Sequence, residues 1–396
     1  MNAVLKRLGS SALSLALTAT LSPAARADCL WKLVSTPDPA PSGNQLNAIA
    51  GTGAHDLWET GATYRTLTSK GYALHFDGKA WTVLREADPS GYGGQFSGIA
   101  SIARNDVWAI GQTYGAGHYS KRSAAAEHWD GARFSVSPLP RVTGSETFLY
   151  GIAAIATNDV WAAGGALAHG GLQQPYVVHW NGSAWTQIAV PGLPGVANNL
   201  DAVAATASDD VWSVGGSQAS ASAPFRTLAE HWDGTQWSIV PTPNVNADSN
   251  VFNAVVALSR HDAWAMGDYN NGRTFAPLAE HWDGTAWTIV PVPNSGTRLT
   301  FVFGATALAA NDVFAAGEIA RRKNGVASYL VHWNGKAWTT VPTPNVPHRP
   351  VTLLNAVKAL PDGSVWAAGG DAGAKIVIDT VTEMRACAKE VGAARR

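Results

Sequence analysis

The chain alternates short apolar stretches with polar turns, and this alternation repeats about every fifty residues. Each repeat carries an Asp-Val-Trp segment or a close variant, then a polar loop, then a phrase of the form His-Trp-Asp-Gly-x-x-Trp. The first aromatic residue recurs at intervals of 50, 53, 51, 52, 50 and 52 residues, as Trp58, Trp108, Trp161, Trp212, Trp264, Phe314 and Trp366. Seven repeats built from short apolar runs and hairpin turns are typical of a propeller, an array or a solenoid.

The repeat around Trp264 predicts four strands. Its apolar runs indicate strands at 252–258, 263–267, 279–282 and 287–292, with a polar turn at 259–262 and a polar loop at 268–273. The third strand turns at Asp283-Gly284, a dipeptide that tolerates the positive φ angles of a tight hairpin. Pro293 would end the fourth strand, because proline cannot donate to a strand ladder. Four antiparallel strands per fifty residues correspond to one propeller blade.

The seventh repeat lacks a fourth strand, and a match to it lies at the other end of the chain. No tryptophan or Asp-Gly pair follows Glu383, whereas Trp31–Pro37 matches Trp287–Pro293 in period and in its proline. We therefore expect an all-β fold, a seven-bladed β-propeller of four-stranded antiparallel blades, whose ring is closed by the N-terminal strand completing the C-terminal blade. The single domain 28–396 would hold this closing strand in 28–45, blades at 46–95, 96–148, 149–199, 200–251, 252–301, 302–353 and 354–387, and a tail at 388–396. These seven blade ranges are called the first to seventh repeats.

Residues that recur in every repeat indicate the scaffold. All seventeen tryptophans belong to the pattern and would fill the wedges between blades, each ring contributing about 2–3 kcal/mol. A histidine precedes the third-strand aromatic in six repeats, at His75, His128, His179, His231, His281 and His332, and we expect it to form hydrogen bonds between blades. The first-turn acids Asp56, Asp106, Asp159, Asp210, Asp262 and Asp312 should accept backbone N–H bonds. Points spread round a ring cannot chelate one ion, so no metal is expected.

The only two cysteines flank the expected junction of the chain ends. Cys29 lies two residues before Trp31, and Cys387 follows the third-strand segment of the seventh repeat. We expect a disulfide between them, which in an oxidising compartment would stabilise the fold by roughly 4–5 kcal/mol in the loop-entropy model. Two unpaired thiols are the alternative.

The first 27 residues have the three parts of an export signal. Lys6 and Arg7 precede the apolar stretch 12–21, and Ala25-Arg26-Ala27 is a small-x-small cleavage site, so a secreted or periplasmic protein is expected. No other segment approaches about 20 uninterrupted apolar residues, which excludes membrane insertion. Cleavage removes three cations and changes the formal charge from −1 to −4, which argues against nucleic acid as a partner. Charged residues make up only 14% of the chain, and we expect a monomer.

Motifs of common enzymes are absent from the sequence. There is no Gly-x-Ser-x-Gly elbow, His-Glu-x-x-His pair, Cys-x-x-Cys pair, calcium loop or glycine-rich phosphate loop, so no cofactor and no catalytic residue are predicted. The repeated acids are distributed round a ring, whereas a glycosidase needs two carboxylates across one bond.

Variable loops between the second and third strands are the expected binding surface. Connectivity places these loops and the interblade loops on one rim, called the variable rim, and the other turns on the opposite, uniform rim. Loops on a rigid scaffold commonly carry binding residues, and tyrosines with Arg, Asn and Gln suit a sugar or a peptide. The candidates are Tyr64, Arg65, Tyr114, His118, Tyr119, His169, Tyr176, Phe225, Arg226, Tyr269, Arg273, Arg321 and Arg322. The alternative for each is a merely solvated loop position.

The chain resembles the kelch-like, galactose-oxidase-type propellers, in which a hydrophobic strand ends in a glycine pair and a downstream aromatic and Trp follow. The segment Val160–Gly165 with Tyr176–Trp180 and Trp185 carries this plan. It is more similar still to exported bacterial repeat proteins of the pattern DVWAVG…HWNGTSW, whose activity is unassigned. The copper oxidase of this fold needs a cysteine cross-linked to tyrosine, whereas both cysteines here are expected to pair with each other, so its activity is not implied.

The function expected from these patterns is binding. The leading hypothesis is an exported, non-catalytic propeller that binds a glycan or an extracellular protein through its variable rim. The alternative is a polysaccharide-active lyase or hydrolase with its site at the mouth of the central channel. Titratable residues from different blades that converge there with perturbed pKa values would favour the enzyme, whereas exposed aromatics without such a cluster would favour binding.

Overall fold

The computed structural model describes residues 29–41, 43–65, 68–88, 90–115, 118–245, 248–270, 272, 274–294, 299–320, 325–344, 351–372 and 378–387. The expected export signal and the tail 388–396 lie outside this part. Trp31–Ala386 forms one compact unit. Its regular elements are all strands, and none of the described chain forms a helix able to cross a membrane.

The strands follow the repeats. The first four repeats contain β2 (Asn44–Gly53), β3 (Asp56–Arg65), β4 (Thr68–Phe76), β5 (Trp81–Arg85); β6 (Gly94–Ala103), β7 (Asp106–Gly115), β8 (His118–Trp129), β9 (Phe134–Val136); β10 (Ser145–Ala156), β11 (Asp159–Ala168), β12 (Gln173–Trp180), β13 (Trp185–Ile188); β14 (Ala197–Ala207), β15 (Asp210–Gln218), β16 (Arg226–Trp232) and β17 (Trp237–Ile239). The other three contain β18 (Asn250–Ser259), β19 (Asp262–Asn270), β20 (Phe275–Trp282), β21 (Trp287–Ile289); β22 (Thr300–Ala309), β23 (Asp312–Ala320), β24 (Val326–Trp333), β25 (Trp338–Thr340); β26 (Val351–Ala359), β27 (Val365–Ala372) and β28 (Ile378–Cys387). An N-terminal strand, β1 (Cys29–Val34), precedes them.

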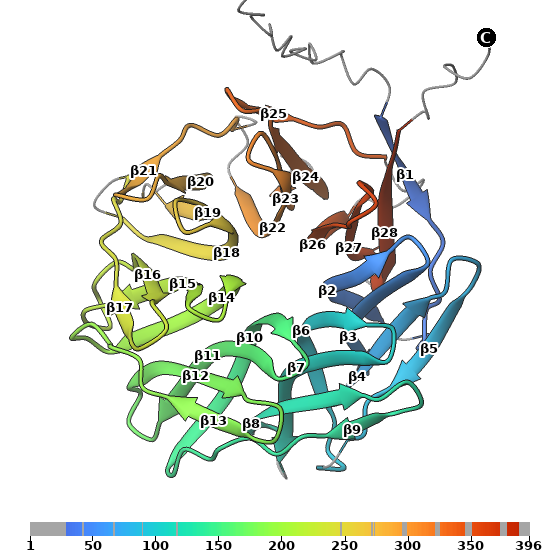
Figure 1. Ribbon diagram of the computed structural model, residues 1–396, viewed down its shortest axis with the longest axis horizontal. Coiled ribbons are helices and arrows are strands. Elements are labelled where there is room, and N and C mark those ends of the chain that lie inside the picture. The colour runs from blue at the N-terminus through green and yellow to red at the C-terminus, as the bar shows by residue number, and fades with distance from the viewer. Residues whose placement is uncertain are drawn as a thin grey trace, which may run out of the picture. The chain divides into compact units, whose positions relative to one another are not determined.

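The all-β, propeller-type arrangement of antiparallel sheets is confirmed. Within each repeat the strands pair in sequence order, and in Figure 1 the first strand of each repeat lies toward the centre. Three sheets have four strands and two have eight, rather than the separate four-stranded sheets expected. One parallel residue pair creates each larger sheet, Gln173 with Ala197 and Val326 with Val351. β1 lies beside β28 in the sheet of the seventh repeat.

The strands of the fifth repeat are longer at the variable rim than their sequence indicates. β19 continues through Asp268 to Asn270, so the expected loop at 268–273 is wrong over these residues. Pairing explains the extension, because Asp268 lies opposite Pro277 and Asn270 opposite Phe275. The buried Asp268 carboxylate accepts a hydrogen bond from Asn253 at 2.9 Å, which satisfies a polar group within the sheet.

Each first strand is interrupted by a β-bulge near its midpoint, and six of the seven have a second register shift near their end. The bulged residues near the midpoint are Asn47, Ser97, Tyr150, Asp201, Asn253, Phe303 and Asn355. Three of the amides donate to a carbonyl of the next repeat: Asn47 to Phe96 at 2.8 Å, Asn253 to Val302 at 2.8 Å, and Asn355 to Leu46 at 2.7 Å. The bulges therefore connect neighbouring sheets near their inner edge.

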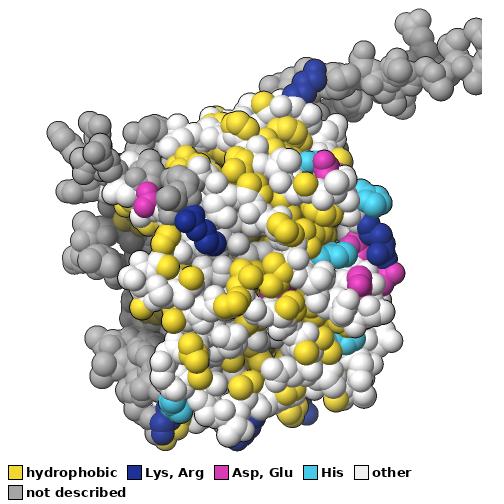
Figure 2. Space-filling model, turned by 90° about the vertical axis from the view of Figure 1, so that its left-hand side faces the viewer, with side chains coloured by type: hydrophobic (Ala, Val, Ile, Leu, Met, Phe, Trp, Pro, Cys, Tyr) yellow, Lys and Arg dark blue, Asp and Glu magenta, His cyan; other side chains and the backbone are white. Residues whose placement is uncertain are grey.

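Aromatic rings pack between neighbouring repeats, as expected. Trp108 of the second repeat contacts Trp180 and Trp185 of the third at centroid distances of 5.0 and 5.2 Å. Trp366 of the seventh repeat likewise lies 6.2 Å from Phe76 of the first. Figure 2 shows that one outer side of the molecule carries few charged groups between scattered apolar patches. The interior between sheets therefore consists of aromatic rings packed with aliphatic side chains.

The expected Asp-Gly hairpins are confirmed, together with the grouping of turns on the uniform rim. Gly78 has φ +93°, and a Cβ there would lie 2.0 Å from Nδ1 of His55, in the turn between β2 and β3. Asp77 accepts the N–H groups of Lys79 and Ala80 at 2.8 and 2.9 Å. The two turns of one repeat therefore pack together, which requires glycine at this position.

Candidate functional site

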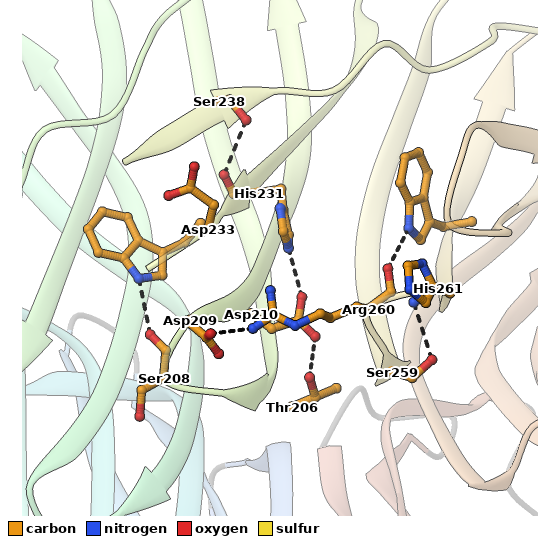
Figure 3. A network of polar contacts seen from close by, with 12 residues as sticks. Thr206, Ser208, Asp209, Asp210, His231, Asp233, Ser238, Ser259, Arg260 and His261 are labelled. Carbon is orange, nitrogen blue, oxygen red and sulfur yellow. Dashed lines mark hydrogen bonds and ion pairs between the residues drawn. The ribbon is translucent and has the colours of Figure 1, made fainter. Parts of the chain in front are cut away.

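The repeated histidines and aspartates form hydrogen-bonded networks within single repeats. Nε2 of His231 lies 2.7 Å from Oδ1 of Asp210, and the other oxygen of this carboxylate, Oδ2, accepts a hydrogen bond from the Thr206 hydroxyl (Figure 3). In the first repeat Trp58 stacks on His75 and donates to Asp56. Burial alone would raise the pKa of Asp56, but hydrogen bonds from His75, Thr52 and Trp58 outweigh it and lower that pKa.

These networks correct two sequence expectations. The histidines bond to an aspartate of their own repeat rather than between blades, because the two residues lie on adjacent strands of one sheet. The aspartates accept side-chain donors instead of the expected turn N–H groups. An ion pair between Asp209 and Arg260 joins the fourth and fifth repeats on this rim (Figure 3). The uniform rim is therefore scaffold.

Tyr176, a predicted ligand contact, belongs to the scaffold as well. Its ring is fully buried, and its hydroxyl donates to the carbonyl of Pro140 in the preceding connection at 2.6 Å. Tyr329 donates in the same way to Pro293. The hydroxyls of Tyr176 and Tyr329 therefore each join two repeats, and the Tyr176 side chain is buried in the scaffold.

The other described candidates are spread over the variable rim. Tyr64 donates to Gln45 at 3.3 Å, Tyr114 is buried and accepts from Gln112, and His169 is exposed. Phe225, Arg226 and Tyr269 lie partly buried in the fourth and fifth repeats. The side chains of Arg65, His118 and Tyr119, the residues Arg273, Arg321 and Arg322, and the side chains of Cys29 and Cys387 lie outside the described part of the chain.

The first repeat departs from the others where its fourth strand ends. Five residues after the fourth-strand aromatic, the other repeats and the N-terminal segment have Leu, Val or Thr followed by proline, whereas the first repeat has Glu86-Ala87. The third strand of the first repeat also departs from the others. Four residues before the repeat histidine it has Gly71, where the other repeats have a residue with a side chain. In the fourth repeat the equivalent pair is Thr227 and Thr242, whose hydroxyls lie 2.7 Å apart. A Cβ on Gly71 would lie 2.4 Å from Oε2 of Glu86, so this glycine admits the glutamate.

A cavity of about 560 Å³ lies beside Glu86 and is called the first-repeat cleft. It is lined by Pro39, Ala40, Thr63, Lys70, Gly71, Tyr72, Val83, Arg85, Glu86 and Asp88. Val83 is 40% exposed and offers an apolar wall, while Lys70 and Arg85 bring positive charge. Asp88 is the only non-glycine residue with a left-handed backbone, φ 41°, in the described chain. The cleft therefore combines apolar surface, charges of both signs and a strained position, as binding sites commonly do.

Carboxylates dominate the electrostatics of the cleft. Burial, helped by the nearby carboxylates of Glu127 and Asp88, raises the pKa of Glu86 to about 7, against the lowering effects of the Gly71 N–H and Lys70. Burial also raises the pKa of Glu127 to about 7, although the Ala87 N–H donates to its oxygens at 2.9 and 3.1 Å. Proline at position 87 would lack this donor. Oε1 of Glu86 has no hydrogen-bond partner in the described structure, and Asp88 pairs with Lys70 at 3.4 Å.

A second group of titratable residues lies at the inner edge of the third and fourth repeats. Burial and the charge of Asp201 raise the pKa of Tyr150, and burial raises the pKa of Asp201 to about 7. Both are bulge residues of neighbouring first strands. Asn199 donates to both Asp201 oxygens at 2.6 and 2.7 Å. Sequence reasoning missed this pair because bulges are not visible in the apolar pattern.

A series of side-chain contacts links Tyr150 to an ion pair. Phe148 lies 5.2 Å from the Tyr150 ring, and the Arg122 guanidinium lies 4.8 Å from the Phe148 ring. Arg122 pairs with Glu146 at 2.9 Å. Among the described residues, no group of three or more His, Cys, Asp or Glu side chains could hold a metal ion.

Comparisons with known proteins identify the fold class. No family model matches the chain, and no curated protein matches it, so the kelch-like assignment stays a prediction. Solved structures do match. The chain resembles YCF48 bound to D1 peptide, with TM-score 0.55, 14% identity, and coverage of 92% of this chain and 99% of that one.

Two polysaccharide-active enzymes are also similar in fold. One is an ulvan lyase bound to a GlcA-Rha3S saccharide, with TM-score 0.50, 9% identity, and coverage of 74% and 81%. The other is a family 74 xyloglucanase from Xanthomonas campestris, with TM-score 0.51, 14% identity and coverage of 86% of this chain. The chain spans only 53% of that xyloglucanase. At these identities the likeness establishes a β-propeller and no activity.

Proposed function

We propose that this chain is an exported, seven-bladed β-propeller that binds a peptide segment of an extracellular protein in the first-repeat cleft. The observation that carries this proposal is the paired departure of Gly71 and Glu86 from the repeat. Residues that only stabilise the fold are expected to be similar in every repeat. A change at two contacting positions of one repeat therefore indicates a role other than stability. The resulting space and mixed charge suit a peptide that bears a basic side chain, with Glu86 as its partner.

The blade count and the ring rest on contacts between the chain ends. The bond from Asn355 to Leu46, the Trp366–Phe76 contact and the position of β1 beside β28 support a ring closed by the N-terminal strand. Cys29 and Cys387, the first residue of β1 and the last of β28, would then be joined by the disulfide. Export is supported by the leader-like residues 1–27.

Peptide binding agrees with the similarity to YCF48, which was solved with a peptide and matches over nearly its whole length. The test begins with selection of peptides from a displayed library by the purified protein. The variant E86T/D88N restores residues found in other repeats, namely Thr242 and Asn244. It should weaken binding at least tenfold, whereas D283N, which copies Asn181 on the uniform rim, should leave it unchanged.

The dependence of peptide binding on pH gives a second readout. Because the pKa of Glu86 lies near 7, its carboxyl group becomes negative as the pH rises through that value. Affinity for a peptide with a basic residue should therefore increase between pH 6 and 8, and E86T should remove this increase. Equal affinity of the wild type and E86T/D88N, or selection of glycans but no peptides, would contradict the proposal.

A polysaccharide-active enzyme is the second candidate, and the pair Tyr150–Asp201 favours it. Two titratable groups from neighbouring repeats, both with raised pKa values, are the arrangement expected of an acid–base site. Assays for unsaturated or reducing sugar products on acidic polysaccharides test it. Turnover that disappears in Y150F and persists in E86T would replace the binding proposal.

A further inference from the structure

A second cavity lies among the inner strands. It has a volume of about 390 Å³ and is lined by residues of β2, β6, β10, β14, β18, β22 and β26, one strand from each repeat. Its lining is almost entirely Ala, Val, Ile, Leu and Gly. We call it the axial cavity. It is separate from the first-repeat cleft, so a ligand bound in it would be independent of the proposed function.

One position of the axial cavity differs sharply between repeats. The residue paired with the first aromatic of the second strand is Ala50, Ala100, Ala153, Ala204, Val256, Thr306 or Lys358 in the successive repeats. Lys358 is the only ionisable side chain among the residues that line the cavity. Its long cationic chain takes the place of a methyl or small group, so packing does not explain it.

The Lys358 ammonium group has no counter-charge in the described structure. No hydrogen bond or ion pair of its Nζ is found among the described residues, and burial lowers its pKa. The nearest repeat contributes the Thr306 hydroxyl, which accepts the Ala359 N–H at 2.9 Å and keeps its own proton free to donate. Oγ of Ser101, also in the lining, has no partner. A cation without a described counter-charge, in a cavity that also contains the Ser101 hydroxyl, favours an anion.

We propose that the axial cavity binds a small monocarboxylate, with its carboxylate on Lys358 and its short chain within the ring of inner strands. A single positive charge suits a monoanion better than phosphate or sulfate, which need several donors to replace their water. The volume lies near the lower end of the range for ligand cavities, which fits a molecule of a few carbons and not a polymer.

Propionate is the probe that tests this site. Isothermal titration of the full chain should give a saturable signal that K358M loses, whereas K336M, which removes an exposed lysine of the sixth repeat, should bind as the wild type does. Because a carboxylate favours the ammonium form, propionate should raise the pKa of one lysine Cε resonance in protein labelled with ¹³C-lysine.

Two results would overturn the proposal. One is K358M binding propionate as tightly as the wild type does. The other is the absence of any propionate-dependent lysine shift in the wild type, which decides the matter even if K358M does not fold. Folding of each variant is checked by its tryptophan fluorescence and circular dichroism.

Discussion

The side-chain amide of Asn355 donates a hydrogen bond to the carbonyl of Leu46 at 2.7 Å, across 309 residues of sequence. Asn47 and Asn253 make the same bond to the next repeat at their own bulges. The last and first repeats are thus linked by the same kind of amide-to-carbonyl hydrogen bond that links neighbouring repeats elsewhere in the chain.

Removal of this amide should destabilise the protein. N355A leaves the Leu46 carbonyl without its partner, and we expect a loss of about 1–3 kcal/mol in the free energy of unfolding. Urea titration monitored by tryptophan fluorescence measures it. N253A, at an internal junction, is the matched variant; if N355A costs nothing while N253A is destabilising, the ends of the chain are not joined as inferred.

The disulfide gives an independent test of the junction. The Cys29–Cys387 cross-link should appear as one linked peptide in a non-reducing digest, and C29S/C387S should unfold at a lower temperature. The loop-entropy model sets the expected loss at roughly 4–5 kcal/mol. Two alkylatable thiols in the protein purified from an oxidising compartment would refute the cross-link.

Stability should decrease as the pH rises from about 4.5 to 8. Burial raises the pKa values of Glu230 and Glu280 to about 8 from the ordinary value of 4.5, and neither carboxyl group has a partner in the described structure. In this window the folded state holds more protons than the unfolded state, so the free energy of unfolding falls with pH. E230Q/E280Q should reduce the slope of the free energy of unfolding against pH; an unchanged slope would mean that these groups ionise normally.

The assignment of Tyr176 to the scaffold predicts a purely structural phenotype. Y176F removes the hydroxyl bond to Pro140 and should cost about 1 kcal/mol of stability without changing peptide affinity. Denaturant unfolding and fluorescence polarisation measure the two quantities on the same preparation. Loss of affinity at unchanged stability would return Tyr176 to the binding surface.

Much of the fold could be predicted because the repeated residues have the same structural role in every repeat. The spacing of Trp58 and its equivalents and the Asp-Gly turns located strands and hairpins from local pattern alone. The site could be predicted less well. Tyr176 is a residue type that is common in ligand contacts, yet here it is buried and its hydroxyl bonds to the Pro140 carbonyl, so that it stabilises the fold.

The first-repeat cleft depends on a pair of residues that the sequence does not place together. Gly71 lies in β4 and Glu86 directly follows the end of β5, and only their packing shows that the glycine makes room for the carboxylate. A comparison of the repeats position by position would have marked both as departures. The bulge residues Tyr150 and Asp201 escaped notice because a bulge shifts the register without changing composition.

Hydrogen exchange with mass spectrometry tests the binding site most directly. On addition of a selected peptide, we expect increased protection in segments 69–72 and 83–88, and no change around Asp210 and His231 on the uniform rim. Protection confined to 145–151 and 199–202, at the inner edge of the third and fourth repeats, would contradict the assignment of function to the first-repeat cleft.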